Sequence, residues 1–304
     1  MLKLREFWHK AFLEERPSVS LCLFRFFVAF TVGAHIIPTF LHLEDNYLHT
    51  AFKEKNLSFF TPEVIQWVEK SPDSFVGFMV IFFCGALCCF AAGFLSQISC
   101  IFMVLGCYYF YALNSLHIGT LSYDILLVTL FPLCVTGYYG DSFSVDAWLR
   151  KDKFAYRKKR PFFIQRLLEL QIASTFFYTA LCKVSAHGNW LTANPLYYLY
   201  NSTPESVVKH FPLRGLLATH PQACYWLGVG IILAEFSLPF LLFIRKTRYW
   251  GIGYGIFFHI LLIVTLHVPT IFFFLFPAQL CLFINPEKVV AWLDKRNTTL
   301  KNPG

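Results

Sequence analysis

The stretch QRLLELQIASTFFYTALCKVSAHGNW, from Gln165 to Trp190, decides the fold class: it is long enough to cross a bilayer yet carries charged side chains. Glu169 lies near its start and Lys183 near its end. A lysine inside a membrane-spanning helix costs about 2.5–3.5 kcal/mol on insertion scales, so it needs a compensating interaction or a function. At helical periodicity, one broad face collects the polar side chains Gln171, Thr175, Tyr178, Thr179, Cys182 and Lys183. We therefore predict that Lys183 is the working residue of a site on the outer side of a membrane.

The composition places the chain in a membrane. Of its 304 residues, 56% are hydrophobic, 19% are aromatic and only 14% are charged, whereas soluble domains average about 25% charged residues. The net charge of +8 comes from short basic clusters between apolar spans, which is typical of cytoplasmic loops and not of a nucleic-acid-binding surface. The ten cysteines nearly all lie inside apolar spans and are predicted to be packing residues. We predict no metal site, because no two loop histidines lie four residues apart on one predicted helix.

Apolar segments of the length that a hydrocarbon core requires, about 17–25 residues, recur along the chain. The predicted spans are 19–40, 74–94, 97–113, 121–140, 162–186, 222–244, 249–266 and 271–285, of which the last is the shortest. An amphipathic piece within 41–73 and a short helix after residue 140 are predicted to lie at the membrane surface. The domains are then a segment 1–18, a transmembrane domain 19–286 and an amphipathic basic tail 287–304.

The distribution of lysine and arginine orients these spans. The basic segments are the N-terminus, the cluster 150–160, the loop 245–248 and the C-terminal tail. With eight spans all four fall on one side, which the positive-inside rule makes cytoplasmic. The predicted fold is an all-α, polytopic membrane protein with about eight transmembrane helices and both termini in the cytoplasm. The membrane is the plasma or inner membrane of a bacterium, or the endoplasmic reticulum of a eukaryote.

Four more of the ionisable residues inside predicted spans bear on the fold or the site. Arg25 and Glu169 lie at equal depth, roughly 10–12 Å from the cytoplasmic boundary at the helical rise per residue, which favours a structural ion pair between them. Glu235 lies near the middle of its span, where it could pair with a histidine, stay protonated or take part in proton transfer. His259 stands alone among apolar neighbours, and a membrane setting favours a function for such a residue. For Lys183 two interpretations stay open. Its long stem could carry the ammonium group to the interface, or the residue could be a buried, neutral amine that acts as a general base.

Five segments in order carry a likeness to a known membrane domain. They are SLCLFRFFVAF (20–30), the two helices and tight turn at 84–114, SVDAWL (144–149), FFYTALCKVSAHGNWL (176–191) and FFHILLIVTL (257–266). Together they resemble the horizontally transferred transmembrane (HTTM) family, the membrane domain of vitamin K-dependent gamma-carboxylases and their bacterial relatives. The likeness covers about residues 15–290, nearly the whole chain.

The resemblance implies an enzyme. In the carboxylases a membrane lysine is held to deprotonate reduced vitamin K; oxygen then yields a strong base that removes a proton from a glutamate side chain, and carbon dioxide adds. That lysine falls on Lys183 and the intramembrane histidine falls on His259. A loop histidine of the carboxylases falls near Gly119, where His117 is the nearby substitute. The resemblance thus implies reduced vitamin K or another quinol as cofactor and a peptide as a candidate partner. The large lumenal domain of the animal carboxylases has no counterpart before the chain ends at Gly304.

We expect a membrane-embedded enzyme that uses a lysine base on a quinol or another lipid-soluble substrate near the outer face. Lys183 is the predicted base, with His259 and His117 supporting or orienting the substrate. The predicted pocket residues are Tyr178, Trp190 and Glu235. The alternative is a non-catalytic membrane component of a maturation, export or immunity system, in which Lys183 only pairs with a carboxylate. A small-molecule transporter ranks third, because spans 1–4 and 5–8 show no convincing repeat with broken helices.

Overall fold

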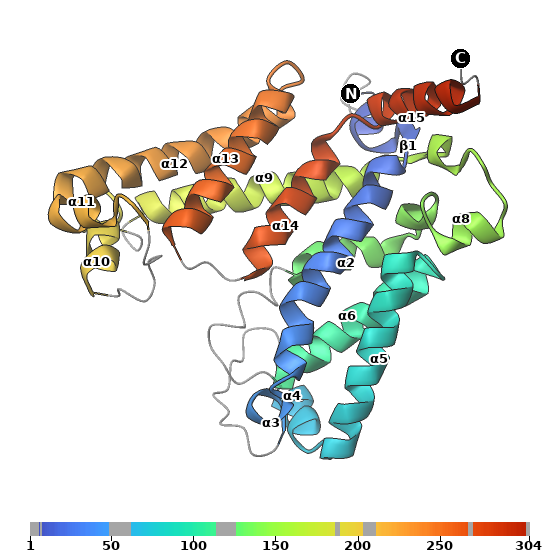
Figure 1. Ribbon diagram of the computed structural model, residues 1–304, viewed down its shortest axis with the longest axis horizontal. Helices are drawn as coiled ribbons and strands as arrows, with labels where there is room; N and C mark the ends of the chain where they lie inside the picture. The colour runs from blue at the N-terminus through green and yellow to red at the C-terminus, as the bar shows by residue number, and fades with distance from the viewer. Residues whose placement is uncertain are drawn as a thin grey trace. The chain divides into compact units, whose positions relative to one another are not determined.

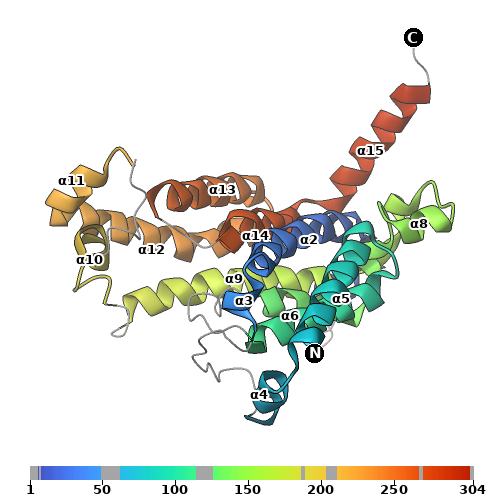
Figure 2. The same ribbon diagram turned by 60° about the horizontal axis from the view of Figure 1, so that its bottom comes forward.

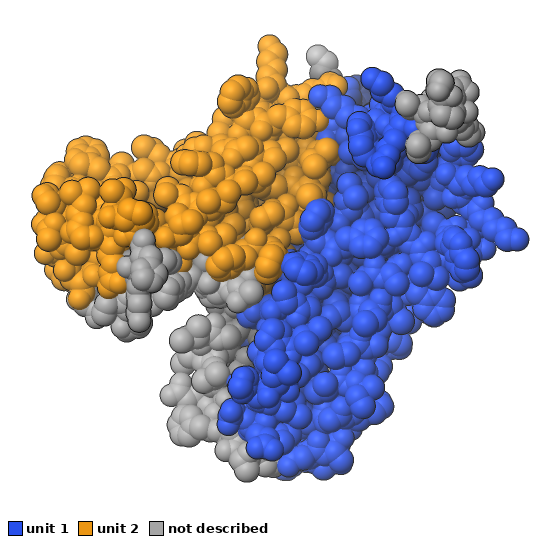
Figure 3. All heavy atoms as spheres, in the orientation of Figure 1, with its two compact units in different colours: residues 1–167, 285–304 blue, residues 168–284 orange. Residues whose placement is uncertain are grey.

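The computed structural model describes residues 6, 8–48, 62–113, 126–185, 189–202, 211–266 and 270–301 (Figure 1). The chain forms two compact units, each described by itself: unit 1 is Met1–Leu167 with Asn285–Gly304, and unit 2 is Leu168–Ile284 (Figure 3). Among the described residues, five helices are long and apolar enough to cross a membrane, and up to six if a broken pair near the C-terminus counts as one span. The protein is therefore a helical, multi-pass membrane protein.

Unit 1 holds three of the five crossing helices. Its elements are η1 (His9–Leu13), β1 (Glu15–Pro17), α2 (Val19–Phe40), α3 (Leu43–Asn46), α4 (Pro62–Glu69), α5 (Asp73–Ala92), α6 (Ser96–Leu113), η2 (Phe131–Val135), η3 (Tyr138–Gly140), α8 (Val145–Leu149), η4 (Ala155–Arg157), β2 (Lys159–Pro161) and α15 (Pro286–Lys301). The crossing helices α2, α5 and α6 match the predicted spans to within a few residues. The amphipathic piece predicted within 41–73 is α4, and the short helix after residue 140 is α8.

The turn between α5 and α6 is fixed by Gly93. This residue has φ +68°, and the bonds from Gly93 N–H to Phe90 O and from Phe94 N–H to Cys89 O form a Schellman motif. A Cβ atom at Gly93 would collide with Nη1 of Arg25 and with the Ser144 side chain. Only glycine therefore fits both the backbone conformation and the space at this turn.

The segment SVDAWL joins α8 to the same turn. Ser144 caps α8, accepting from Ala147 N–H at 3.0 Å. The Asp146 carboxylate accepts from the N–H groups of Leu95 at 2.9 Å and Ser96 at 3.1 Å, which satisfies free donors where α6 begins. The serine and aspartate of this segment are thus helix caps.

Arg25 of α2 lies fully buried in unit 1. Its guanidinium donates to the backbone carbonyls of Tyr139 at 2.9 Å and Phe143 at 2.5 Å, which links α2 to the chain around η3. Glu169 belongs to unit 2 and is also buried. The predicted ion pair between Arg25 and Glu169 would join the two units and stays a prediction.

The fourth predicted span differs from the structure at its end. The apolar helix covers Leu126–Val135 and finishes in the 3₁₀ turn η2, and residues 121–125 lie outside the described part. Thr136 is extended, so a continuous helix to residue 140 is wrong. Pro132 lacks an N–H for the helical ladder and stands at the start of η2, which explains the early end.

A two-stranded antiparallel sheet, which the sequence patterns did not predict, connects the N-terminus to the basic cluster. β1 pairs with β2, with Glu15 opposite Pro161 and Pro17 opposite Lys159.

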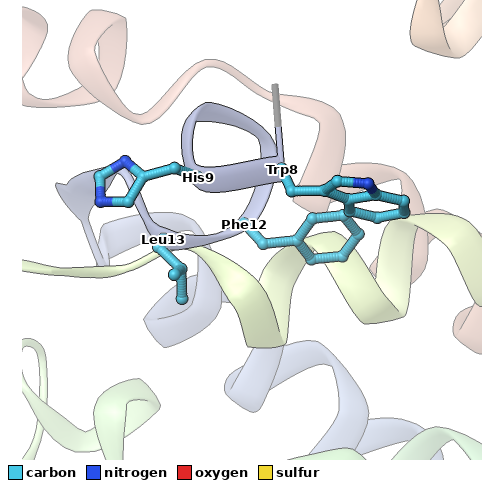
Figure 4. Close-up of a pocket in the computed structure, with 4 residues that line it drawn as sticks. All are labelled: Trp8, His9, Phe12 and Leu13. Atoms are coloured by element: carbon cyan, nitrogen blue, oxygen red, sulfur yellow. The ribbon is translucent and has the colours of Figure 1, made fainter. Parts of the chain in front are cut away.

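The C-terminal helix α15 packs against α2 and β1, and its Asp294 accepts a hydrogen bond from Tyr156 at 2.7 Å. Ahead of β1, Trp8 stacks on Phe12 with ring centroids 5.2 Å apart (Figure 4).

Unit 2 contains the other two crossing helices. Its elements are most of α9 (Phe163–Val184), then α10 (Pro195–Ser202), α11 (Arg214–Thr219), α12 (Pro221–Phe243), α13 (Arg248–Thr265), α14 (Thr270–Leu280) and η6 (Cys281–Phe283). The views of Figures 1 and 2 both show α12 and α13 side by side. Gly251 lets α13 approach the α12 backbone closely, because a Cβ there would lie 3.0 Å from the carbonyl carbon of Leu241. The 22-residue α9 has the length of a crossing, but its charged and amide side chains keep it out of the five.

Candidate functional site

The described part of unit 2 brings together a lysine and a glutamate from two different helices. Nζ of Lys183, near the end of α9, donates to Oε1 of Glu235 at 2.7 Å and to Oε2 at 2.6 Å. The side chains are 18% and 10% exposed. Glu235 is the fifteenth of the 23 residues of α12, so the ammonium lies beside the middle part of that helix and not beside its end. The lysine stem therefore reaches a carboxylate of another helix.

The turn that follows α9 places Trp190 over this pair. Asn189 has a left-handed backbone, with φ +49°, and the Trp190 N–H donates to the carbonyl of Lys183 at 3.2 Å. The Trp190 ring centroid then lies 5.3 Å from the Lys183 Nζ, a cation–π distance. The ring also lies against α12, where a Cβ on Gly228 would be 3.6 Å from it. Gly228 precedes Glu235 by two helical turns, so both residues share one face of α12.

The apolar surroundings of the pair come from a buried cluster of unit 2. Its members include Ile231 and Ala234 of α12 and Phe258 of α13, with Phe176 and Trp190 packed against them. In such low-polarity surroundings the attraction between the two charges is stronger than in water, and the cost of desolvating them offsets much of that gain. Removing one partner leaves an uncompensated charge, which costs about 3–5 kcal/mol for a buried pair.

His259 lies in an aromatic layer of the same unit. It is 7% exposed on α13, and its ring centroid lies 4.9 Å from that of Phe276. Phe276 in turn lies 4.9 Å from Phe176, which precedes Lys183 by two turns of α9. The predicted role of His259 in supporting or orienting a substrate stays a prediction.

Two threonines on the polar face of α9 form hydrogen bonds within their own helix. Thr175 Oγ1 donates to the carbonyl of Gln171 at 2.9 Å, and Thr179 Oγ1 donates to that of Phe176 at 2.9 Å. Both hydroxyls thus have backbone acceptors in their own helix, as threonines commonly do, and need no substrate as a partner. Tyr178 is 68% exposed, whereas the Lys183 side chain is only 18% exposed. Its predicted place in a substrate pocket stays a prediction.

The loop histidines fall mostly outside the described residues, among them His117, a predicted catalytic residue. Of the others, His220 is described and exposed at the start of α12, with Nδ1 2.8 Å from Thr219 Oγ1. Within the described ranges, no group of three or more His, Cys, Asp or Glu side chains could hold a metal ion. A surface hollow of about 580 Å³ in unit 1 is lined, among the described residues, by Trp8, His9, Phe12 and Leu13 (Figure 4).

Sequence reasoning singled out both members of the pair but did not join them. Their separation of 52 residues gives no periodic signal. The available signal was one of charge: each is an ionisable residue in an otherwise apolar part of its helix, and opposite charges in a membrane tend to pair. The cation–π contact of Trp190 depends on the left-handed backbone conformation of Asn189, which single-sequence patterns do not reveal.

Comparison with known protein families gives a match over most of the chain. The family model of the HTTM domain matches residues 14–288, which is most of the chain. None of the curated proteins compared with the chain matches it, and neither does any of the solved structures. Because the family match covers far more than half of the sequence and the five crossing helices agree with a membrane domain, the chain belongs to the HTTM family.

Proposed function

We propose that this protein is a membrane-embedded acid–base enzyme of the gamma-carboxylase-like kind, in which Lys183 takes a proton from a quinol or another lipid-soluble substrate. The observation that carries the proposal is the contact of Lys183 Nζ with both carboxylate oxygens of Glu235, at 2.7 and 2.6 Å, beside the face of Trp190. The HTTM family membership and the likeness of the Lys183 segment to that of the carboxylases support it.

Glu235 gives Lys183 a way to act as a base. A lysine held as an ammonium ion cannot accept a proton, so its own proton must first go elsewhere. Transfer from Nζ to an Oε atom of Glu235, 2.6–2.7 Å away, leaves a neutral amine beside a neutral carboxylic acid. The amine then accepts a proton from the substrate hydroxyl, and the new ammonium faces the oxygen that lost it. Glu235 is thus the proton store of the proposed site.

The side chains around the pair suit a flat, apolar ring. Trp190 presents an aromatic face beside the amine, and Phe176, Phe276 and His259 form a second aromatic layer in the same unit. A quinol would supply a hydroxyl with a pKa near that of tyrosine, about 10, which a neutral amine can deprotonate. The resemblance extends the proposal to carboxylation of a glutamate-containing partner peptide.

The proposed orientation puts the loop after α9 on the outer or lumenal side. It combines the five crossing helices with α9, the helix at 126–135 and α14 as further spans, which gives eight. Both termini and the loop Arg245–Arg248 then share the cytoplasmic side, as the positive-inside rule requires.

The direct test is quinol-dependent oxygen uptake by the purified full-length chain in nanodiscs. Lys183→Arg keeps the positive charge opposite Glu235 but cannot release a proton. We expect it to remove activity by about a hundredfold or more, the usual contribution of a positioned base. Lys246→Arg, in an exposed loop, is the matched control and should leave the rate unchanged. Full activity in Lys183→Arg would exclude Lys183 as the base.

The second candidate function is a non-catalytic membrane component of a maturation, export or immunity system. The observation that favours it is the completeness of the ion pair, since both oxygens of Glu235 are engaged by one ammonium group. Such a pair can simply fasten α9 to α12. The two candidate functions make different demands. A structural ion pair between α9 and α12 needs only opposite charges, whereas a catalytic base needs an amine at one particular position.

A further inference from the structure

A hollow in unit 1 lies outside the proposed site. It measures about 520 Å³ and is formed by the segment between Ser142 and Tyr156. Aromatic side chains of Phe143, Trp148 and Tyr156 form its walls, and Lys151 and Lys153 also line it. Its size is that of a small-molecule site, for which about 300–1,000 Å³ is typical.

The contacts of α8 locate this hollow at a membrane surface. The Asp146 N–H donates to the carbonyl of Gly93 at 3.1 Å, and the Asp146 carboxylate accepts from Leu95 and Ser96 N–H. Those residues form the turn at which α5 ends and α6 begins, and both helices are long and apolar enough to cross the bilayer. The turn of such a hairpin lies at the interface between lipid and water, and so does α8.

The exposed side chains around the hollow are those of an interface. Trp148 is 76% exposed, Leu149 57% and Phe154 51%. Large apolar side chains in these positions are costly in water but favourable at the depth of lipid headgroups, where tryptophan is enriched. The segment therefore meets lipid with its aromatic side chains while its lysines remain at headgroup level.

The charge of the segment is strongly positive. From Arg150 to Arg160 seven of eleven residues are basic and one is acidic. Three of the seven have carboxylate partners: Arg157 with Asp294, and Lys158 and Arg160 with Asp141. The structure records no carboxylate partner among its described residues for Lys151 or Lys153. The neighbouring Asp152 also lines the hollow, and its Oδ1 accepts from the Phe154 N–H at 3.1 Å.

We propose that this hollow binds the headgroup of an anionic phospholipid. Lys151 and Lys153 supply the positive charge for its phosphate, and Phe143 and Trp148 contact the upper part of its acyl chains. The argument for this occupant is charge complementarity at a membrane surface, since clusters of basic residues beside a membrane helix attract anionic lipids. A zwitterionic lipid brings its own cation and gains less from two lysines.

Lipid retention by the full-length chain tests this. The detergent-purified protein is titrated with phosphatidylglycerol or with phosphatidylcholine of the same acyl chains, and bound lipid is counted by native mass spectrometry. We expect Lys151→Gln with Lys153→Gln to weaken phosphatidylglycerol binding by about tenfold or more, because each lysine near an anionic surface contributes a factor of about five. Both lysines are exposed, so the variant should fold, and phosphatidylcholine binding should not change.

The matched control is Arg245→Gln with Lys246→Gln, which removes two charges from an exposed basic loop of unit 2. It should leave phosphatidylglycerol binding within about twofold of the unmodified chain, less than one lysine's share. Equal losses in both variants would reduce the effect to general electrostatics and overturn the proposal. Equal binding of the two lipids, or displacement of phosphatidylglycerol by millimolar inorganic phosphate, would also overturn it.

Discussion

At the scale of single residues, the charge of Lys183 on α9 is neutralised by Glu235 on α12. Its position in an apolar helix indicates that something compensates its charge, and Glu235 is that partner at 2.6–2.7 Å. The identity of the partner depends on how α9 and α12 pack, and no local pattern encodes it. The same holds for Arg25, whose partners Tyr139 and Phe143 are backbone carbonyls and therefore carry no side-chain signature.

Breaking the pair from either side should destabilise unit 2. We expect Lys183→Met and Glu235→Leu each to lower the free energy of unfolding by about 3–5 kcal/mol, because each leaves one charge without its partner. The double variant Lys183→Met with Glu235→Leu should lose less than either single change, since no charge remains to be desolvated. Unfolding in mixed micelles measures the cycle, and strictly additive losses would show that the two residues do not interact.

Gly93 should tolerate no side chain. Gly93→Ala places a Cβ against Arg25 at a residue with φ +68°, and we expect a loss of about 1–3 kcal/mol in unfolding free energy from backbone strain and crowding. Gly85→Ala is the control, because the same helix leaves open space around that position. Equal melting temperatures for the two variants would contradict close packing around Gly93.

At the level of elements, the sequence predicts helices better than their ends and connections. α2, α5, α6, α12 and α13 follow from the length of their apolar runs, which turns or charges bound on both sides. The helix before η2 ends early because Pro132 interrupts the ladder within an apolar run. The β1–β2 pairing escapes the patterns because three-residue strands containing proline give no alternation to detect.

The link between β1, β2 and α2 should depend on pH through Asp141. Burial alone would raise the pKa of this carboxyl, but hydrogen bonds from Arg160 and Lys158 outweigh it and lower the pKa below the ordinary value. The unfolded chain then binds more protons near pH 4, so this contribution to stability is complete above about pH 4 and falls below it. Asp141→Asn should remove that part of the dependence.

Thermal unfolding between pH 3 and 6 measures this effect. Asp152→Asn is a suitable comparison, because Asp152 is an exposed carboxyl in the neighbouring loop. If Asp141→Asn loses stability on acidification as steeply as the unmodified chain does, the cluster does not sense pH.

At the scale of the whole molecule, family membership and the five crossing helices establish a multi-pass membrane protein. The sequence is enough to predict this class of protein, because a lipid environment requires an apolar composition and helices long enough to span it. The arrangement of the site does not follow in the same way. It depends on contacts between α9, the turn at Trp190 and α12 that are distant in sequence.

The proposed eight-span topology places both chain ends on one side. A fluorescent protein fused after Gly304 should therefore fold and fluoresce in a bacterial host, whereas alkaline phosphatase inserted after Pro212 should be active outside the cytoplasm. Insertion of the phosphatase after Lys246 should be inactive. Phosphatase activity after Lys246 would reverse the predicted orientation or change the number of spans.

The charge-swapped variant Lys183→Glu with Glu235→Lys most directly separates chemistry from fastening. It restores opposite charges between α9 and α12 but moves the amine to the other helix. If Lys183 is the base, the swapped chain should unfold within about 1–2 kcal/mol of the unmodified chain, yet its quinol-dependent oxygen uptake in nanodiscs should fall about a hundredfold or more. Full oxygen uptake in the swapped chain would contradict the role of Lys183 as the base.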